Sequence, residues 1–241
     1  MRYAVLSDIH GNLEALNSVM EHLISERIDR YFCLGDVVGY GANPSECLNR
    51  LIEVEALIVA GNHDYACLGK LQISWFNDAA RAAVTWTRNQ LGFTELDSLR
   101  RLPLTATEGA FTLVHGSLKY PQRFEYLHDA AQAIDSIRVC RTQICLVGHT
   151  HVPAIFSSDN NKVDYLEGPK IRVDSERRYV INSGSVGQPR DGDPRASYAI
   201  YDDEEPTVEI KRVEYDVKKA QEKILRAGLP ARLAYRLSEG R

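Results

Sequence analysis

Asp36 is the residue around which the polar chemistry of this chain is arranged. It lies in the segment Leu34-Gly-Asp-Val-Val-Gly-Tyr-Gly41, directly after the apolar run Tyr31-Phe-Cys-Leu34. Such a run is typical of a buried parallel strand, and open α/β sheets place their ligands at the carboxyl ends of strands. The flanking glycines allow close approach of the backbone, so this carboxylate is suited to bind a cation. A single aspartate after a strand would more often cap a turn or the next helix.

The same arrangement, polar side chains directly after an apolar run, occurs four more times along the chain. Because side chains alternate along an extended segment, Asp8 and His10 are expected to point the same way, and His149 and His151 have the same spacing. In chain order the motifs are DxH, GD, GNHD, HG and GHTH. The residues that they contribute are Asp8, His10, Asp36, Asn62, His63, His115, His149 and His151.

Carboxylate, amide and imidazole groups favour Mn²⁺, Fe, Zn²⁺ or Ni²⁺ over Ca²⁺ or Mg²⁺. No thiolate belongs to the set, which argues against a structural zinc site. The ligands are too many for one tetrahedral ion and fit two ions about 3.5–4 Å apart. Two such ions would retain positive charge for an anionic substrate. A hydroxide bridging them would be the nucleophile for in-line attack on phosphorus.

Alternating strands and helices must bring these motifs to one edge of a sheet. Helical spacing of Leu13, Leu16, Met20 and Leu23 predicts a first crossover helix, and further helices are expected at 44–54 and 130–139. Strands that end at the polar motifs are predicted at 3–6, 31–34, 57–60, 111–114 and 144–147, and residues 103–109 are expected to be a connection. After residue 152, short antiparallel strands are predicted at 154–156, 162–166, 171–173, 179–181, 197–201 and 207–213.

Residues 65–101 interrupt this alternation, and their apolar spacing predicts two helices with no strand between them. We expect an insertion over the strand ends, which is either a lid that shapes substrate access or additional packing against the sheet. A further helix is expected at 216–225, and the last dozen residues are either a marginal helix or a frayed tail. The predicted organisation is one domain over 1–241, with a helical insertion at about 65–101 and a C-terminal tail at about 214–241.

Composition narrows the class of protein. The 241 residues are 44% hydrophobic and 26% charged, with a net charge of −4, which argues against binding of a nucleic-acid polymer. There is no apolar run of roughly 18 residues and no signal-peptide core, so no membrane partner is expected. The five cysteines form no CxxC pair and are expected to be reduced, which points to the cytoplasm. The oligomeric state is left open.

The ordered set of motifs resembles the calcineurin-like metallophosphoesterase superfamily over roughly residues 3–200. The segments Gly35-Asp-Val-Val-Gly-Tyr-Gly41 and Asn182-Ser-Gly-Ser-Val-Gly-Gln-Pro-Arg190 are similar to the small bacterial and archaeal phosphodiesterase-like branch. The resemblance implies an α/β fold, a four-layer α/β/β/α sandwich with a dinuclear metal site at the carboxyl ends of the strands.

The resemblance also implies a role for each residue. One metal would be held by Asp8, His10, Asp36 and His151, and the other by Asp36, Asn62, His115 and His149. Asp36 would bridge the two ions. His63 would not be a ligand but would face the substrate phosphate as general acid or charge stabiliser, oriented by Asp64.

One departure separates the chain from the Ser/Thr protein phosphatases. These carry Asp-Arg-Gly after the GD motif, where this chain has Gly39-Tyr40-Gly41, so their phosphate-binding arginine is missing. Arg190 or Arg195 could replace it from the glycine-rich loop, or both could be solvated turn residues. His22 and His128 fall outside the strand-end pattern and are expected to be surface or packing residues.

The function expected from these residues is metal-dependent hydrolysis of phosphodiester or phosphoanhydride bonds in a small phosphorylated substrate, and a nucleotide is the substrate that we expect. Manganese is the first choice of metal, and Fe, Zn and Ni stay open because availability decides as much as affinity. A phosphomonoesterase, including a protein phosphatase, is the alternative within enzymes. A non-catalytic metal-binding scaffold is the alternative outside them, although the complete ligand set and the presence of His63 speak against it.

Overall fold

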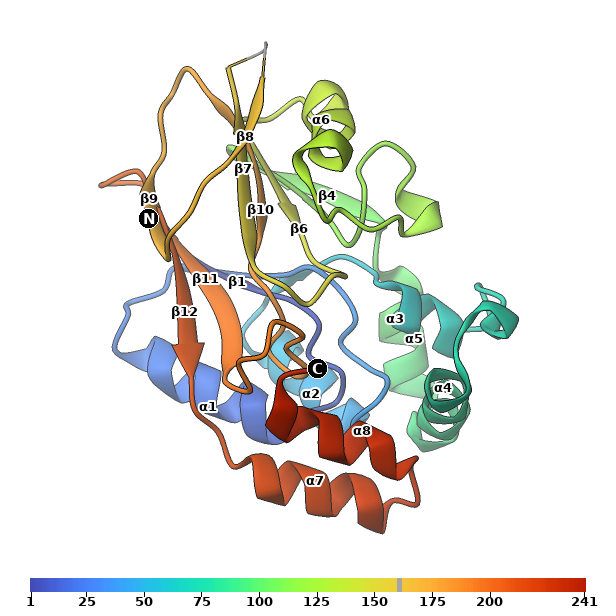
Figure 1. Cartoon of the computed structure of the whole chain (residues 1–241). Helices are drawn as coiled ribbons and strands as arrows, with labels where there is room; N and C mark the ends of the chain where they lie inside the picture. Colours follow the sequence, from blue (N-terminus) through green and yellow to red (C-terminus); the bar gives the residue numbers. More distant parts are fainter. Residues whose placement is uncertain (160–161) are drawn as a thin grey trace.

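Two six-stranded sheets packed face to face form the centre of the computed structural model, which describes residues 1–159 and 162–241 (Figure 1). The first sheet has the order β3 (Leu57–Ile58), β2 (Arg30–Cys33), β1 (Arg2–Leu6), β11 (Ala196–Asp202), β12 (Thr207–Val213) and β9 (Lys170–Arg172). The second has the order β4 (Thr105–Glu108), β5 (Phe111–Val114), β6 (Ile144–Val147), β10 (Arg178–Asn182), β7 (Ala154–Ser158) and β8 (Val163–Tyr165).

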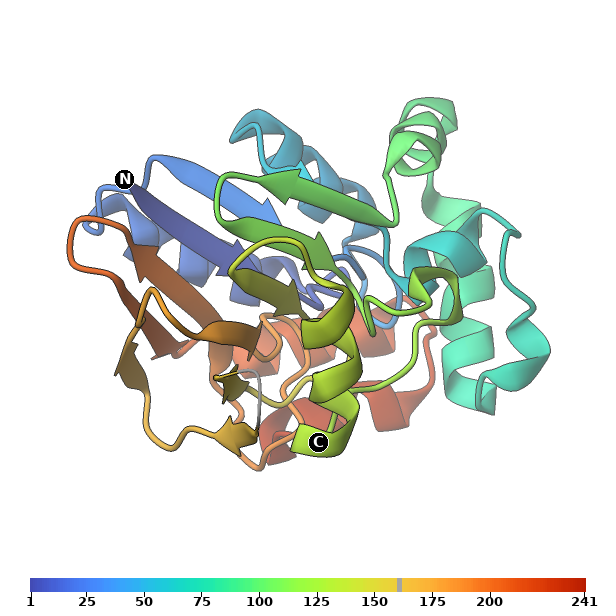
Figure 2. The same ribbon diagram turned by 90° about the horizontal axis from the view of Figure 1, so that it is seen from above.

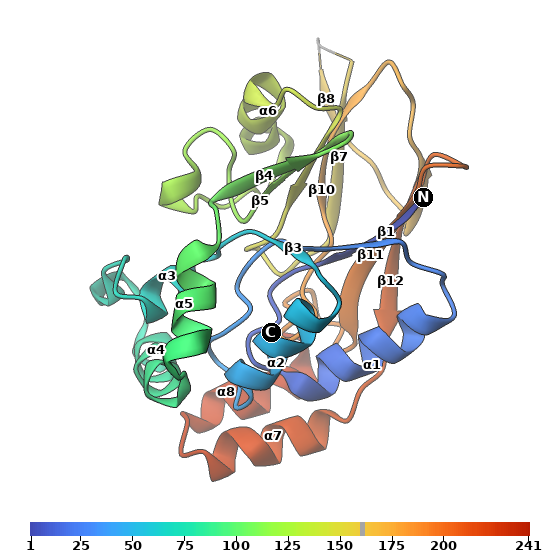
Figure 3. The same ribbon diagram turned by 180° about the vertical axis from the view of Figure 1, so that it is seen from behind.

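Helices cover the outer face of each sheet and complete four layers. The first sheet is covered by α1 (Leu13–Ile24) and α2 (Pro44–Glu53), with α7 (Val217–Arg226) packed against α1 (Figure 3). The second sheet is covered by α6 (Ala130–Val139), whose apolar side chains contact β6, β7 and β10. The expected α/β/β/α sandwich is therefore confirmed. Among the described residues no helix is both long and apolar enough to cross a bilayer.

The central strands β1, β5 and β6 are almost continuously apolar because both of their faces are buried. In β1, Tyr3 and Val5 pack between the two sheets, while Ala4 and Leu6 pack against the helices of the first sheet. Aromatic rings join the sheets across the central layer, with the centroids of Tyr3 and Phe111 4.9 Å apart. The inter-sheet core fixes how the two sets of strand ends face each other.

The polar motifs meet because parallel strands end at the same edge of each sheet. In the first sheet β1 pairs in parallel with β2 and β2 with β3, and in the second β6 pairs in parallel with β5 and β10 (Figure 2). Backbone hydrogen bonds then join the loops beyond the strands. The amides of Asp8 and His10 donate to the carbonyls of Gly35 and Asp36, at 3.0 and 2.9 Å.

Residues 62–101 form helices, as expected, but the first of them begins earlier than predicted. The GNHD motif opens α3 (Asn62–Cys67) rather than forming a simple turn, because the Asp64 carboxylate accepts the amide of Gly61, the residue that precedes the helix. The short η1 (Ile73–Trp75), α4 (Asp78–Gln90) and α5 (Phe93–Arg101) follow.

One further segment differs from the sequence-based expectation, and a second one decides between two alternatives. Residues 103–109 were expected to be a connection, but Thr105–Glu108 is an edge strand paired antiparallel with β5. Its sequence has no large apolar residue because only one neighbour strand and one half-buried face support it. Of the two alternatives for the C-terminal residues, the structure has the helical one, with α8 (Ala231–Tyr235) and η3 (Arg236–Glu239). Leu233 and Leu237 are buried there with Ile224.

Candidate metal centre

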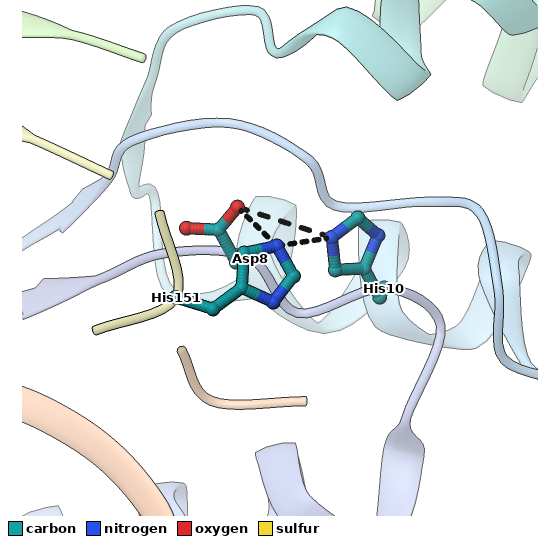
Figure 4. Close-up of side chains that lie close together, drawn as sticks. All are labelled: Asp8, His10 and His151. Carbon is teal, nitrogen blue, oxygen red and sulfur yellow. Dashed lines mark hydrogen bonds and ion pairs between the residues drawn. The ribbon is translucent and has the colours of Figure 1, made fainter. Parts of the chain in front are cut away.

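Asp8, His10 and His151 converge at the edge where the two sheets meet (Figure 4). Oδ1 of Asp8 lies 3.2 Å from Nε2 of His151 and 3.8 Å from Nε2 of His10. The two Nε2 atoms are themselves 3.2 Å apart. All three side chains are buried, so their polar atoms face one another rather than water.

A second group surrounds Asp36. Its Oδ2 lies 3.4 Å from Nε2 of His115 and 3.6 Å from Nε2 of His10. Nε2 of His115 is also 3.1 Å from Oδ1 of Asn62 and 3.1 Å from Nδ1 of His149. Oδ2 of Asp36 therefore lies between a histidine of the first group and a histidine of the second, which is the position that a shared carboxylate must occupy.

Backbone carbonyls set the orientation of three of the imidazoles. In each, Nδ1 lies within hydrogen-bond distance of a main-chain oxygen, so a neutral ring donates there and turns the lone pair of Nε2 to the centre. The pairs are His10 with Val38 at 3.2 Å, His115 with Leu34 at 2.7 Å and His151 with Gln188 at 2.6 Å. The role of Gln188 was not predicted, because nothing in its own sequence context marks a carbonyl as a histidine partner.

The backbone of the candidate ligands is held in an uncommon conformation. Five of them have left-handed φ angles: Asp8 at 52°, His10 at 49°, Asp36 at 51°, His149 at 69° and His151 at 61°. Such angles cost roughly 1–2 kcal/mol per residue and gather at functional sites. The glycine next to this cluster is required, since a Cβ on Gly61 would lie 2.0 Å from Oδ1 of Asp36.

Electrostatics in the buried cluster favour charged carboxylates and mostly neutral imidazoles. Burial alone would raise the pKa of Asp36, but His115 and the other histidines hold it well below its usual range. Burial lowers the pKa of His63 to about 4, and it also lowers those of His10, His149 and His151. Burial acts the same way on His115, but the charge of Asp36 outweighs it and raises that pKa to about 9. Neutral imidazole is the form that binds metals.

The donor set fits divalent cations. Oδ1 of Asp8 is fully buried and has no hydrogen-bond partner among the described residues. It faces Nε2 of His151, which carries a lone pair when Nδ1 donates to Gln188. Two acceptors then face each other without a hydrogen between them, and a cation bound by both would remove this repulsion. Two groups of ligand atoms, Asp8–His10–His151 and Asp36–His115–His149, each lie within 4.8 Å of one another. A third such group joins His10 and Asp36 to His63.

His63 is packed beside the cluster by aromatic rings. Its ring stacks on Phe76 at a centroid distance of 5.0 Å and lies 4.3 Å from the ring of Tyr40. Its amide donates to Oδ1 of Asp36 at 2.8 Å, and its buried Nδ1 has no hydrogen-bond partner within the described chain. His63 thus has a side-chain nitrogen available at the edge of the cluster.

Asp64 does not orient His63, contrary to expectation. One of its oxygens accepts the amides of Asp36 and Gly61, both at 2.9 Å, and the other accepts the amide of Val38 at 3.2 Å. Burial and the neighbouring charge of Asp36 raise the pKa of Asp64 to about 7. Its carboxylate therefore joins the loop of the GD motif to the start of α3 and positions the backbone of Asp36.

A cavity of about 130 Å³ opens beside the cluster and separates the two candidate arginines. Arg190 lines it, together with His63 and Tyr40. Arg195 instead forks onto Asp193 at 2.7–3.2 Å, and its side chain is 49% exposed. The structure thus brings one of the two predicted arginines to the site.

The other histidines lie outside the cluster, as expected. His22 packs beside Tyr198, with its Nδ1 2.6 Å from the tyrosine hydroxyl. His128 is exposed and stacks on Tyr126. Tyr126 itself lines the cavity and stacks flat on His149, at 3.9 Å and 12°. Its position was not predicted, because it lies in a loop of mixed composition without a periodic signal.

Three comparisons place this geometry among known proteins. The family model of the calcineurin-like phosphoesterase superfamily domain matches residues 1–205. The uncharacterised protein MJ0912 of Methanocaldococcus jannaschii is 43% identical over 99% of this chain and 98% of its own.

Solved structures that are similar to this chain over its whole length include two from other organisms. A metallophosphoesterase from Sphaerobacter thermophilus is 42% identical with a TM-score of 0.89, covering 100% of this chain and 99% of its own. The hypothetical protein PH1004 from Pyrococcus horikoshii shares the fold at 24% identity and a TM-score of 0.80, over 100% and 98% of the two chains.

The position of Asp36 between the two groups predicts the effect of removing its charge. The change Asp36→Asn keeps the shape of the side chain but should lower metal occupancy at both positions, because both depend on one carboxylate. Asp8→Asn should lower occupancy at one position only. The measurement is metal content per chain after Mn²⁺ loading and gel filtration. Two full equivalents in the Asp36 variant would contradict a shared carboxylate.

Proposed function

The chain belongs to the calcineurin-like phosphoesterase superfamily and is a hydrolase of phosphoric esters, and from that premise we propose that it cleaves phosphodiester or phosphoanhydride bonds of nucleotide-type substrates with two divalent metal ions. The observation that carries the proposal is the pair of carboxylate–imidazole groups joined at Asp36 and open to one cavity. The number of ligands supports two ions rather than one.

Each ion would take its ligands from the strand ends of both sheets. One would be held by Asp8, His10, Asp36 and His151, and the other by Asp36, Asn62, His115 and His149. Such ions lower the pKa of a bound water and withdraw negative charge from the phosphate. Manganese is the proposed metal, because the donor set combines oxygen with imidazole nitrogen and contains no thiolate.

The protein's own residues fix the phosphate and assist departure of the leaving group. His63 lines the cavity, with Phe76 and Tyr40 restricting its ring. From that place it can donate a proton or a hydrogen bond to a phosphate oxygen. Its backbone is tied to Asp36, so the ring is held at a constant position relative to the metal ligands.

Arg190 supplies an uncancelled positive charge to the same cavity. Its guanidinium donates to Oε1 of Gln188 at 2.9 Å and lies 5.9 Å from the ring centroid of Tyr40. Among the described residues it forms no ion pair with a carboxylate, unlike Arg195. A guanidinium without a carboxylate partner is suited to bind a phosphate oxygen, and we propose that role for Arg190.

We also propose that the protein works in the cytoplasm. All five cysteines are free and buried, and none forms a disulfide in the described part of the chain. Free buried thiols are typical of a reducing compartment.

Hydrolysis of bis-p-nitrophenyl phosphate beside p-nitrophenyl phosphate tests the proposed reaction. Metal-stripped protein is reloaded with Mn²⁺, and release of p-nitrophenol is compared for the two esters with and without the metal. We expect faster, metal-dependent cleavage of the diester. Faster cleavage of the monoester would indicate a phosphomonoesterase. No turnover of either ester, or of a panel of dinucleotide polyphosphates, with two metals bound would indicate a scaffold.

The change His63→Ala separates catalysis from metal binding. We expect the rate of diester cleavage to fall roughly 10²–10⁴-fold, the usual scale for loss of an acid–base group, with metal content unchanged. Steady-state kinetics and metal analysis on the same preparation provide the two readings. Loss of metal together with activity would instead make His63 a ligand, in line with its closeness to His10 and Asp36.

Arg190 and Arg195 form a matched pair for the phosphate contact. Arg190→Ala should raise KM roughly 10- to 100-fold, because a charge-assisted hydrogen bond to the substrate is lost. Arg195→Ala removes the same charge five residues away and should leave KM within about twofold, since its guanidinium is bound to Asp193 at the surface. Equal effects of the two changes would show that only overall charge matters.

A further inference from the structure

Trp75 is 78% exposed, although tryptophan is among the residues that gain most from burial. Its ring belongs to none of the hydrophobic clusters and contacts no other aromatic ring within the described residues. Of the two functions expected for the 65–101 insertion, packing against the sheet therefore does not explain this side chain. The next residue, Phe76, packs on the core and on His63, so the backbone that carries the indole is anchored.

Tyr126 is the corresponding residue of a second segment. It is 46% exposed, and its buried neighbour Leu127 packs with the α6 layer. Its ring lies flat on His149, a candidate metal ligand, at 3.9 Å. The exposed ring of Tyr126 thus extends from the candidate ligand His149 outward to solvent.

Both aromatic residues line the cavity that contains Asp36, His149 and Arg190. The segments that carry them, around η1 and after η2 (Pro121–Arg123), lie on the same side of the molecule (Figures 1 and 3). Apart from Ala80, every apolar side chain of the lining is aromatic. A lining of this kind offers planar stacking faces and polar groups, and it offers no aliphatic pocket for an alkyl or lipid chain.

We propose that Trp75, in a cavity whose lining also includes Tyr126, forms a stacking site for the planar heteroaromatic base of the substrate. The proposal rests on the proposed function, since it names the part of a nucleotide that this chain recognises. The phosphate would lie beside the candidate metal ligands and Arg190, and the base would lie on the exposed indole face of Trp75. Base–aromatic stacking tolerates different bases, because every base has a π-face.

Fluorescence of Trp75 reports such stacking without any turnover. The chain has two tryptophans, and Trp86 lies on α4 outside the cavity, so Trp86→Phe leaves Trp75 as the only indole. Metal-loaded protein of this background is titrated with adenosine 5′-monophosphate and, separately, with ribose 5-phosphate. The two probes share the phosphate and the sugar and differ in the base. We expect quenching by the nucleotide and no quenching by the sugar phosphate.

The second measurement is the affinity of substituted proteins for the nucleotide. Competition by adenosine 5′-monophosphate against cleavage of bis-p-nitrophenyl phosphate gives an inhibition constant in otherwise unmodified protein. Trp75→Ala should weaken it roughly 5- to 150-fold, and Trp75→Phe should restore most of the loss. The control is Phe93→Ala, which removes another aromatic ring with 81% exposure that lies on α5 and does not line the cavity. It should leave the inhibition constant unchanged.

The outcomes separate this inference from the proposed function. Diester cleavage with competition by the nucleotide but no quenching of Trp75 would overturn the stacking site and leave the phosphodiesterase standing. Equal quenching by both probes would also overturn it, because the phosphate alone would then be sensed. Base-dependent quenching in a protein that cleaves neither nitrophenyl ester would support the stacking site while removing the evidence for the reaction. Loss of affinity in Phe93→Ala equal to that in Trp75→Ala would overturn the assignment to this cavity.

Discussion

The structure depends on keeping two carboxylates charged inside the protein, where the two sheets meet. Asp8 and Asp36 are almost fully buried, and isolated buried charges are strongly unfavourable. Each is surrounded by imidazoles, which hold both pKa values below the usual range, and each also accepts a backbone amide. The loops beyond the strand ends must therefore hold these partners in place. This requirement explains why so much hydrogen bonding is concentrated beyond the strand ends.

Backbone geometry supplies that order. Left-handed residues turn the chain sharply after β1, β2 and β6, so several side chains reach one point instead of continuing along the strand direction. Such turns persist only where their surroundings determine them. Here Asp64 binds three amides of neighbouring loops, and the segment 185–188 pairs with the loop after β1. A site built in this way is rigid, and it agrees with a reaction in which positioning of the phosphate is the main task.

The outer part of the site is exposed and aromatic, unlike the buried inner part. Close to the candidate metal ligands the side chains are buried and fixed by several contacts, whereas Trp75 and Tyr126 line the same cavity and are exposed to solvent. Rigid inner residues suit a phosphate group, whose geometry does not change between substrates. Exposed aromatic faces suit the variable part of a substrate, because stacking depends little on the exact pattern of hydrogen bonds.

The sequence alone determined the alternation of strands and helices and the members of the polar cluster, because both depend on local patterns, whereas the four-layer arrangement came from the family resemblance. Apolar runs followed by Asp, Asn or His mark strand ends, and parallel strands of one sheet must end together. The edge strand at 105–108 escaped prediction, since one half-buried face leaves no apolar run to recognise. The C-terminal helices were left undecided for a related reason. Their few apolar residues, such as Leu233, gain meaning only from the surface that they cover.

Only the tertiary structure decided which residues touch. Asp64 follows His63 directly in the chain, yet the helix that begins there turns its carboxylate to distant amides. Arg190 and Arg195 share one loop, but a neighbouring carboxylate binds one, and the cavity receives the other. The sequence left the 65–101 insertion open between a lid and packing against the sheet, and only the structure shows that Trp75 within it is exposed. These outcomes depend on contacts between segments far apart in sequence, and no local pattern encodes them.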